Sequence, residues 1–212
     1  VESRGLGDVY KRQAHIKTLG GERKYVEPAK GTVNPRVFID KLAKKMPANV
    51  TVVADVGQNQ IWTCTEYKFR KEGRLLTSGG MGTMGYSVPA AIGAKMADDS
   101  RATVAICGDG AFQMSFMELA TAVQFGVDIK VVVMTNNRLG MVRELQTNGY
   151  HDRQTAVFLD GSPDFIKLAE AYGIPAMRVY DDDTMEKGVE MLAEHKGICL
   201  VEVVVDKDMP TL

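Results

Sequence analysis

Apolar and polar positions follow two alternating patterns along most of the chain. Short, mostly apolar runs without alternation predict strands, at residues 50–54, 75–77, 103–107, 129–135, 176–179 and 199–205. The segments between them have helical spacing, at residues 37–46, 58–67, 89–96, 112–125, 140–146, 164–172 and 185–195. Strands without alternation, each followed by a helix, indicate a sheet that is buried on both faces. The pattern therefore predicts a three-layer α/β/α fold around a mostly parallel sheet.

Capping residues support two of the predicted helix starts. Asn34 precedes Pro35, which is the usual order of an N-cap and a first helical position. The run Asp181-Asp182-Asp183 has two interpretations, a helix-capping turn and a metal site. We favour the capping turn, because three consecutive side chains do not all point at one ion.

Length and composition place limits on the function. The 212 residues are enough for one domain that buries roughly 70% of its unfolded surface. A net charge of -1 argues against binding to nucleic acid or to an anionic membrane, and no apolar run approaches the roughly 20 residues that span a bilayer. Cys64, Cys107 and Cys199 lack the spacing of a zinc site, so we expect buried, reduced thiols in a cytoplasmic protein.

The start of the chain differs from the rest. Residues 1–13, VESRGLGDVYKRQ, are polar and without periodicity. They resemble a translated adapter read-through at the end of a metagenomic fragment, and we expect them to be non-native; an ordinary flexible terminus is the alternative. Residues 14–33 are interpreted as a linker, since they contain adjacent glycines and Pro28. Residues 34–208 then form the one folded domain.

Polar residues follow two neighbouring predicted strands. Gly108-Asp109-Gly110 ends one apolar run, and Asn136-Asn137 ends the next. In a parallel sheet both strand ends meet at the same edge, where ligands usually bind. Carboxylate and carboxamide oxygens suit Mg²⁺, which commonly shares its ligand shell with phosphate. The sequence therefore predicts a magnesium-diphosphate site at this edge.

Two further segments are expected to reach the same edge. Residues 55–62, DVGQNQIW, place polar side chains at a helix start, where backbone amides attract anions. Residues 78–95 contain glycines at positions 79, 80, 82 and 85, which let another molecule approach the backbone, with Met81 and Met84 between them. A polar helix start and a flexible turn are the simpler interpretations of these two segments. Their coincidence with the Asp109 motif favours a ligand-facing role for both.

These motifs together resemble a known family. Gly-Asp-Gly followed, after the next strand, by Asn-Asn resembles the signature of thiamine-diphosphate (ThDP) enzymes. GQNQIW, TSGGMGTMGYSVPAAIGAK and LGMVRELQ are similar to the large subunit of acetolactate synthases. The resemblance covers about residues 34–205, which correspond to the C-terminal, ThDP-binding (diphosphate) domain of that family. It implies the ThDP-binding fold.

The resemblance implies roles for individual residues. The side chains of Asp109 and Asn136 and the backbone carbonyl of Arg138 are expected to bind Mg²⁺. Counting back from Leu-Gly-Met at 139–141 favours Asn136, whereas reading Asn-Asn literally selects Asn137. The expected cofactor-binding residues are Gly57, Gln58, Asn59, Gly82, Met84, Gly108, Asp109, Gly110, Ala111, Asn136, Gly140 and Met141. Met84 is expected to lie under the cofactor and to impose its bent shape.

The expected substrate pocket consists of Met141, Val142 and Leu145, with leucine where many relatives have tryptophan. The implied reaction condenses pyruvate with a second 2-oxo acid and releases CO₂, in branched-chain amino acid biosynthesis. We expect a homo-oligomer, a possible regulatory small subunit, and no nucleic-acid or membrane partner. No residue of this chain is assigned as catalytic, because the activating glutamate and the FAD site are expected in other domains. We therefore expect a fragment that is inactive by itself.

Two alternatives remain open. One is the diphosphate-binding subunit of another ThDP-dependent 2-oxo acid decarboxylase or lyase. The other is a non-enzymatic module that binds a magnesium-diphosphate ligand.

Overall fold

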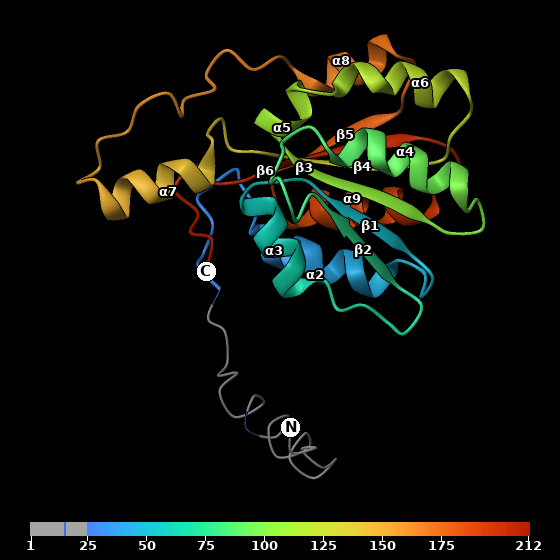
Figure 1. Ribbon diagram of the computed structural model, residues 1–212, viewed down its shortest axis with the longest axis horizontal. Helices are drawn as coiled ribbons and strands as arrows, with labels where there is room; N and C mark the ends of the chain where they lie inside the picture. Colours follow the sequence, from blue (N-terminus) through green and yellow to red (C-terminus); the bar gives the residue numbers. More distant parts are fainter. Residues whose placement is uncertain (1–14, 16–24) are drawn as a thin grey trace.

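Six parallel strands form one sheet at the centre of the molecule (Figure 1). The computed structural model describes residue 15 and residues 25–212, so the predicted non-native segment lies outside the described residues. The strands are β1 (Thr51–Ala54), β2 (Arg74–Thr77), β3 (Thr103–Gly108), β4 (Lys130–Thr135), β5 (Ala176–Val179) and β6 (Cys199–Val204). Their spatial order is β2-β1-β3-β4-β6-β5, and every neighbouring pair is parallel. The predicted parallel sheet is confirmed.

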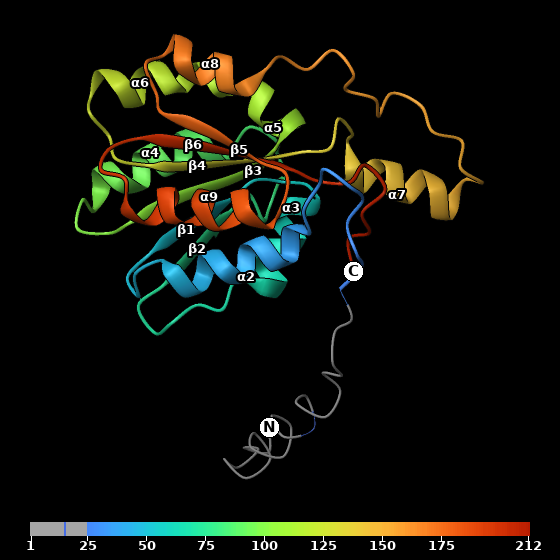
Figure 2. The ribbon, with the colours of Figure 1, turned by 180° about the vertical axis from the view of Figure 1, so that it is seen from behind.

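Helices cover both faces of the sheet (Figures 1 and 2). On one face lie α2 (Pro35–Lys45), α3 (Gln58–Glu66) and α9 (Asp182–Glu194). On the other lie α4 (Ser87–Ala97), α5 (Asp109–Gln113), the 3₁₀ helix η1 (Phe116–Glu118), α6 (Leu119–Gln124) and α8 (Phe165–Ala171). Helix α7 (Gly140–Gly149) stands to one side of the sheet (Figures 1 and 2). The three-layer prediction is therefore confirmed, and within the described residues no helix is long and apolar enough to span a membrane.

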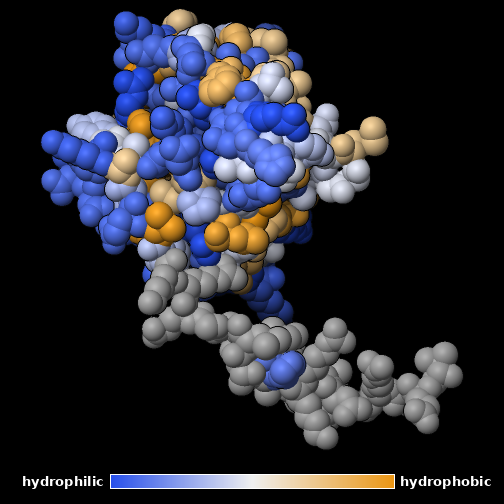
Figure 3. Space-filling model, turned by 90° about the vertical axis from the view of Figure 1, so that its left-hand side faces the viewer, coloured by the Kyte–Doolittle hydropathy of each residue, from blue (hydrophilic) through white to orange (hydrophobic). Residues whose placement is uncertain are grey.

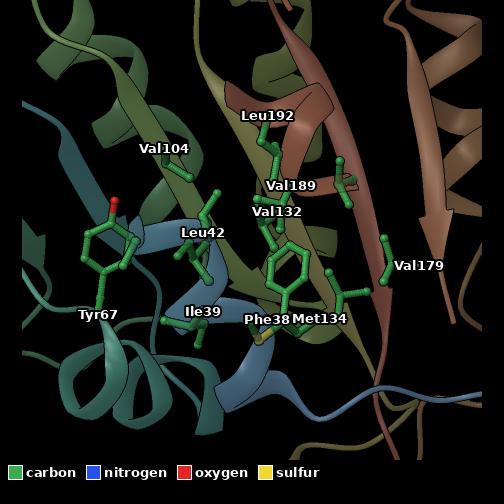
Figure 4. Close-up of a cluster of buried hydrophobic side chains, with 14 of the residues drawn as sticks. Phe38, Ile39, Leu42, Tyr67, Val104, Val132, Met134, Val179, Val189 and Leu192 are labelled. Atoms are coloured by element: carbon green, nitrogen blue, oxygen red, sulfur yellow. The ribbon is translucent and has the colours of Figure 1, made fainter. Parts of the chain in front are cut away.

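Each face of the sheet has its own hydrophobic core. On one face Phe38 and Leu42 of α2 pack with Val132 of β4 and Leu192 of α9, all completely buried (Figure 4). On the other face the rings of Phe112 and Phe165 meet edge to face, with their centroids 5.3 Å apart. The strands are packed between the two cores, so the strand ends are held in fixed positions.

The predicted helix over residues 112–125 is wrong in one respect, because the structure divides it. Helix α5 already begins at Asp109 and ends at Gln113, and Ser115 (φ -143°, ψ 10°) interrupts the helical backbone before η1 and α6. At this interruption a Cβ built on Gly85 would lie 3.0 Å from Cβ of Met114. The break therefore lies against the glycine-rich loop, a tertiary contact that the helical periodicity does not reveal.

Two smaller predictions have opposite outcomes. The capping turn at Asp181 is confirmed. The Asp181 side chain accepts a hydrogen bond from the Thr184 backbone N–H, and the Thr184 hydroxyl oxygen accepts one from the Asp181 backbone N–H. The expectation of three buried thiols is wrong for Cys64, which is exposed on α3, although Cys107 and Cys199 are buried. Cys64 lies on a turn of α3 that faces away from the core, whereas the other two lie on central strands.

A buried ion pair joins α2 to α3. Nε and Nη2 of Arg36 both donate to Oε1 of Glu66, at 2.8 and 2.6 Å, and the two residues are 9% and 4% exposed. Removing one member of such a pair leaves a buried charge without its main partner. The pair therefore fixes the position of α3, which carries part of the candidate site.

We predict that Arg36→Met destabilises the fold by about 3–5 kcal/mol, because it removes the positive charge and two hydrogen bonds that the buried Glu66 carboxylate receives from Arg36. The matched control, Lys45→Met, breaks the exposed pair with Glu194 and is expected to leave stability nearly unchanged. Thermal unfolding of the two variants is the measurement. Equal melting temperatures would contradict a structural role for the buried pair.

Candidate functional site

A pocket lies at the point in the sheet where the order of the strands reverses direction. From β1 the chain places β2 on one side, and it then places β3 on the other side of β1. Such a reversal leaves a crevice at the carboxyl ends of the strands, because the following loops diverge there. A cavity of about 130 Å³ occupies this position, between the loops that follow β1, β3 and β4.

Most of the residues expected from sequence line this pocket. They are Gly57, Gln58, Asn59, Met84, Gly108, Asp109, Gly110, Ala111, Asn136, Arg138, Gly140, Met141 and Val142. Gly82 and Leu145 lie outside the lining, and both are exposed. The structure therefore brings together segments that are about 80 residues apart in sequence, from Gly57 to Gly140.

Asp109 holds the loop that follows the neighbouring strand. Its Oδ2 accepts hydrogen bonds from the backbone N–H groups of Asn136, at 3.1 Å, and Asn137, at 2.6 Å. Its Oδ1 accepts from the N–H of Gly110, at 2.8 Å. Burial raises the pKa of this carboxyl group to about 6, although the backbone N–H groups act in the opposite direction.

The two asparagines are placed differently. Asn136 lines the pocket, and its Oδ1 accepts a hydrogen bond from the Arg138 N–H at 3.0 Å. Asn137 does not line the pocket, and its backbone is left-handed, with φ 55°. The Arg138 side chain turns to an ion pair with Asp160 and stacks over Phe158, so its backbone is the part available to the pocket. This placement favours Asn136 over Asn137 as a ligand, and the assignment stays a prediction.

Gln58 lies at the centre of a polar network beside the pocket. Its Nε2 donates to the Met209 carbonyl at 3.0 Å and to the Thr211 hydroxyl at 3.1 Å, and Glu144 accepts at 3.3 Å. Its Oε1 accepts from Nδ2 of Asn136 at 3.3 Å. Gln58 therefore connects the start of α3, the loop after β4, helix α7 and the end of the chain.

Gly140 is required by this arrangement. A Cβ on Gly140 would lie 1.9 Å from Oε1 of Gln58 and 2.5 Å from its Cδ. Helix α7 thus begins against the Gln58 side chain, at a distance that only glycine permits. Glycine at this position therefore allows the close approach of α7 to the Gln58 side chain of α3, and not an unusual backbone conformation.

Sequence reasoning missed an apolar part of the pocket wall. The additional lining residues are Val56, Trp62, Met134, Leu139 and Val205. Several of them lie next to a predicted site residue or at the end of a strand. This position in the sequence could have identified them as pocket residues. Residues 209–211 had no comparable sequence signal. The structure nevertheless places them beside the pocket wall, because the Trp62 indole donates to the Pro210 carbonyl at 3.2 Å.

The residues expected to contact substrate lie on the outer part of the pocket. Met141 and Val142 line it and are partly exposed, and Leu145 is 60% exposed on the next turn of α7. Figure 3 looks at the side of the molecule on which α7 stands, and it shows hydrophobic side chains between hydrophilic ones. The buried residue of α7 is Arg143, whose Nη2 donates to the Met209 carbonyl at 3.4 Å.

The oxygen atoms in the pocket suit a divalent cation that also binds a phosphate ligand. Among residues 25–212 only backbone N–H groups donate to the buried Asp109 carboxylate, and no lysine or arginine forms an ion pair with it. A cation there would stabilise the ionised carboxylate. The described residues contain no cluster of three or more His, Cys, Asp or Glu side chains, so one carboxylate, one amide and one carbonyl leave coordination positions to other oxygens.

We predict that Gly140→Ala costs about 1–3 kcal/mol of stability, because its Cβ displaces the Gln58 side chain and disrupts the network around it. In the control, Gly149→Ala in the same helix, the new Cβ meets only Cδ1 of Leu145 at 4.0 Å. The control is expected to be neutral or slightly stabilising, since alanine favours helix. Equilibrium urea unfolding measures both variants, and a neutral Gly140→Ala would show that Gln58 moves aside freely.

Comparison with known proteins gives the chain its family. Residues 55–203 match the family model described as thiamine pyrophosphate enzyme, C-terminal TPP binding domain. The chain is 39% identical over 185 residues to the mitochondrial acetolactate synthase catalytic subunit of Aspergillus candidus, covering 86% of this chain and 26% of the relative. It is 38% identical over 181 residues to the acetolactate synthase large subunit of Lactococcus lactis, covering 85% and 31%.

The acetolactate synthase isozyme 2 large subunit of Escherichia coli is 34% identical over 200 residues, covering 93% of this chain and 36% of that protein. The chain thus spans about a quarter to a third of the length of the curated relatives it matches. The family match includes every residue that lines the pocket except Val205. The chain therefore belongs to the thiamine pyrophosphate enzymes, as a C-terminal TPP-binding domain similar to that of acetolactate synthases.

Proposed function

We propose that this chain holds ThDP and Mg²⁺ in an acetolactate synthase, which condenses pyruvate with a second 2-oxo acid and releases CO₂. The observation that carries the proposal is the pocket at the reversal of the strand order, which gathers Asp109, Asn136 and Met84 from three separate loops. The relatives printed as acetolactate synthases support the reaction. The same proposal includes FAD elsewhere in the whole protein, a homo-oligomer and a cytoplasmic location.

The residues of this chain bind and orient the cofactor in the proposed function. Asp109, Asn136 and the Arg138 carbonyl would hold Mg²⁺, and the backbone N–H groups that follow Gly57 and Gly108 would bind the diphosphate. When bound, ThDP supplies a carbon nucleophile that adds to a 2-oxo acid and stabilises the charge left after loss of CO₂. The apolar residues Met84, Met134 and Val205 limit the access of water to the reacting centre.

The outer wall of the pocket would select the second 2-oxo acid. Met141 and Val142 line the pocket beside the entrance, and Leu145 is one turn further along α7. A leucine at this position contributes less surface than the tryptophan of many relatives. Differences of methylene size are worth about 1–3 kcal/mol, so the pocket is expected to accept both pyruvate and 2-oxobutyrate with modest preference.

The proposed function is tested with the complete protein, pyruvate, ThDP and Mg²⁺. We expect acetolactate and CO₂ to form only when both cofactors are present, and Asp109→Asn to lower the activity by about 100-fold or more at a fixed Mg²⁺ concentration. Colorimetric detection of acetoin after acidification measures acetolactate. Release of CO₂ without acetolactate would instead support a ThDP-dependent decarboxylase, and binding of ThDP without turnover would support a non-enzymatic module.

The metal assignment is tested by two asparagine variants. Asn136→Ala removes the proposed ligand, and we expect it to raise the Mg²⁺ concentration needed for half-maximal activity by about 10-fold or more. Asn137→Gly is the matched control, because glycine accepts φ 55° and keeps the N–H that bonds to Asp109. Titration of apoenzyme with Mg²⁺ distinguishes them, and a larger effect of Asn137→Gly would transfer the ligand role to Asn137.

A further inference from the structure

A second buried aspartate lies one strand away from Asp109 and repeats its arrangement. Asp55 follows β1 directly, is completely buried, and has its own backbone N–H bonded to the Ile106 carbonyl at 2.8 Å. Its carboxylate accepts the N–H of the next residue, Val56, at 2.8 Å, as Asp109 accepts that of Gly110. Each aspartate also accepts two backbone N–H groups from the loop that follows an adjacent strand.

The loop that Asp55 holds is the base of the glycine-rich segment. Oδ1 accepts from the N–H of Gly85 at 3.1 Å, and Oδ2 accepts from the N–H of Ser87 at 2.8 Å. Ser87 is the first residue of α4, and the N-cap of that helix, Tyr86, makes no capping hydrogen bond with its side chain. Asp55 therefore supplies from β1 the acceptor and the negative charge that a helix N-terminus requires.

The loop has an open tip and a fixed base. A Cβ built on Gly79, Gly80 or Gly82 would meet no atom within 4 Å. Gly85, by contrast, has φ +85°, and a Cβ built on it would lie 3.0 Å from Cβ of Met114. Hydrogen bonds from Asp55 on one side and the Met114 contact on the other thus restrain the base.

Met84 is the residue of this loop that lines the pocket, and it directly precedes the restrained base. Asp55 itself does not line the pocket, although its neighbours Val56 and Gly57 do. Its carboxylate therefore influences the pocket through the backbone of Gly85 and Ser87. The position of that backbone decides where the Met84 side chain enters the cavity.

We propose that Asp55 is a positioning residue that fixes Met84 against the cofactor by anchoring the base of the glycine-rich loop. The proposal rests on the proposed function, because it assigns to Met84 a contact with ThDP. It assigns to Asp55 no contact with cofactor, metal or substrate. Loss of the anchor should therefore change loop order, ThDP affinity and turnover together, while the Mg²⁺ site around Asp109 stays intact.

The test uses Asp55→Asn in the complete protein. Asparagine keeps the shape but turns an amide donor toward either the Gly85 or the Ser87 N–H, so one of the two hydrogen bonds to the base of the loop is lost. The matched control is Asp164→Asn, because Asp164 also accepts two backbone N–H groups at a helix start, far from the pocket in sequence and absent from its lining. Asparagine is a good N-cap there.

Two measurements are made on each variant. Hydrogen–deuterium exchange without cofactor follows residues 78–88, and steady-state kinetics gives kcat and the half-saturating concentrations of ThDP and Mg²⁺. For Asp55→Asn we expect faster exchange in residues 78–88, a ThDP requirement raised about 10-fold, a lower kcat and an unchanged Mg²⁺ requirement. Asp164→Asn is expected to leave all four quantities as in the unmodified protein.

Unchanged exchange in Asp55→Asn would overturn the proposal, because the loop would then not depend on the anchor. Faster exchange with unchanged ThDP requirement and kcat would also overturn it, because Met84 would not need a fixed base. Failure of the unmodified protein to bind ThDP would instead contradict the proposed function, and the exchange data would still report on the anchor itself.

Discussion

Two buried carboxylates, Asp55 and Asp109, hold the loops that surround the pocket. Burying a carboxylate costs free energy unless hydrogen bonds replace the lost water, and each aspartate accepts three backbone N–H groups. The dependence is mutual, since the loops have fixed positions because of the carboxylates and the carboxylates are tolerated because of the loops. The strand ends supply the rigid base on which both interactions rely.

The two aspartates differ in whether their carboxylates are available to a ligand in the pocket. Asp109 lines the pocket, and burial raises its pKa to about 6 without a basic side chain of the described residues to offset its charge. A divalent cation would supply that charge, and the single carboxylate leaves coordination positions for phosphate oxygens. Asp55 lies behind the wall and its acceptors are directed to a loop and a helix start. We propose that the same local arrangement supports a metal ligand directly after β3 and a loop anchor directly after β1.

The surroundings of Gln58 show how closely the elements around the pocket approach one another. Helix α7 begins at Gly140, where a Cβ would overlap the Gln58 side chain as it is placed. The same side chain donates hydrogen bonds to the Met209 carbonyl and the Thr211 hydroxyl, so the last described residues are held between α3 and α7. A diphosphate contact from Gln58, as expected from the family resemblance, would therefore share this amide with the end of the chain.

The sequence by itself determined the parallel sheet, the helix starts at Asn34 and Asp181, and the meeting of the Asp109 and Asn136 motifs at one edge. These features follow from local patterns, because apolar runs, caps and strand ends act over a few residues. Tertiary structure decided the division of the helix after Asp109, the exposure of Cys64, the contacts of residues 209–211 and the hydrogen bonds of Asp55 to the glycine-rich loop. Each of these depends on which segments, distant in sequence, pack side by side, and no local periodicity records such contacts.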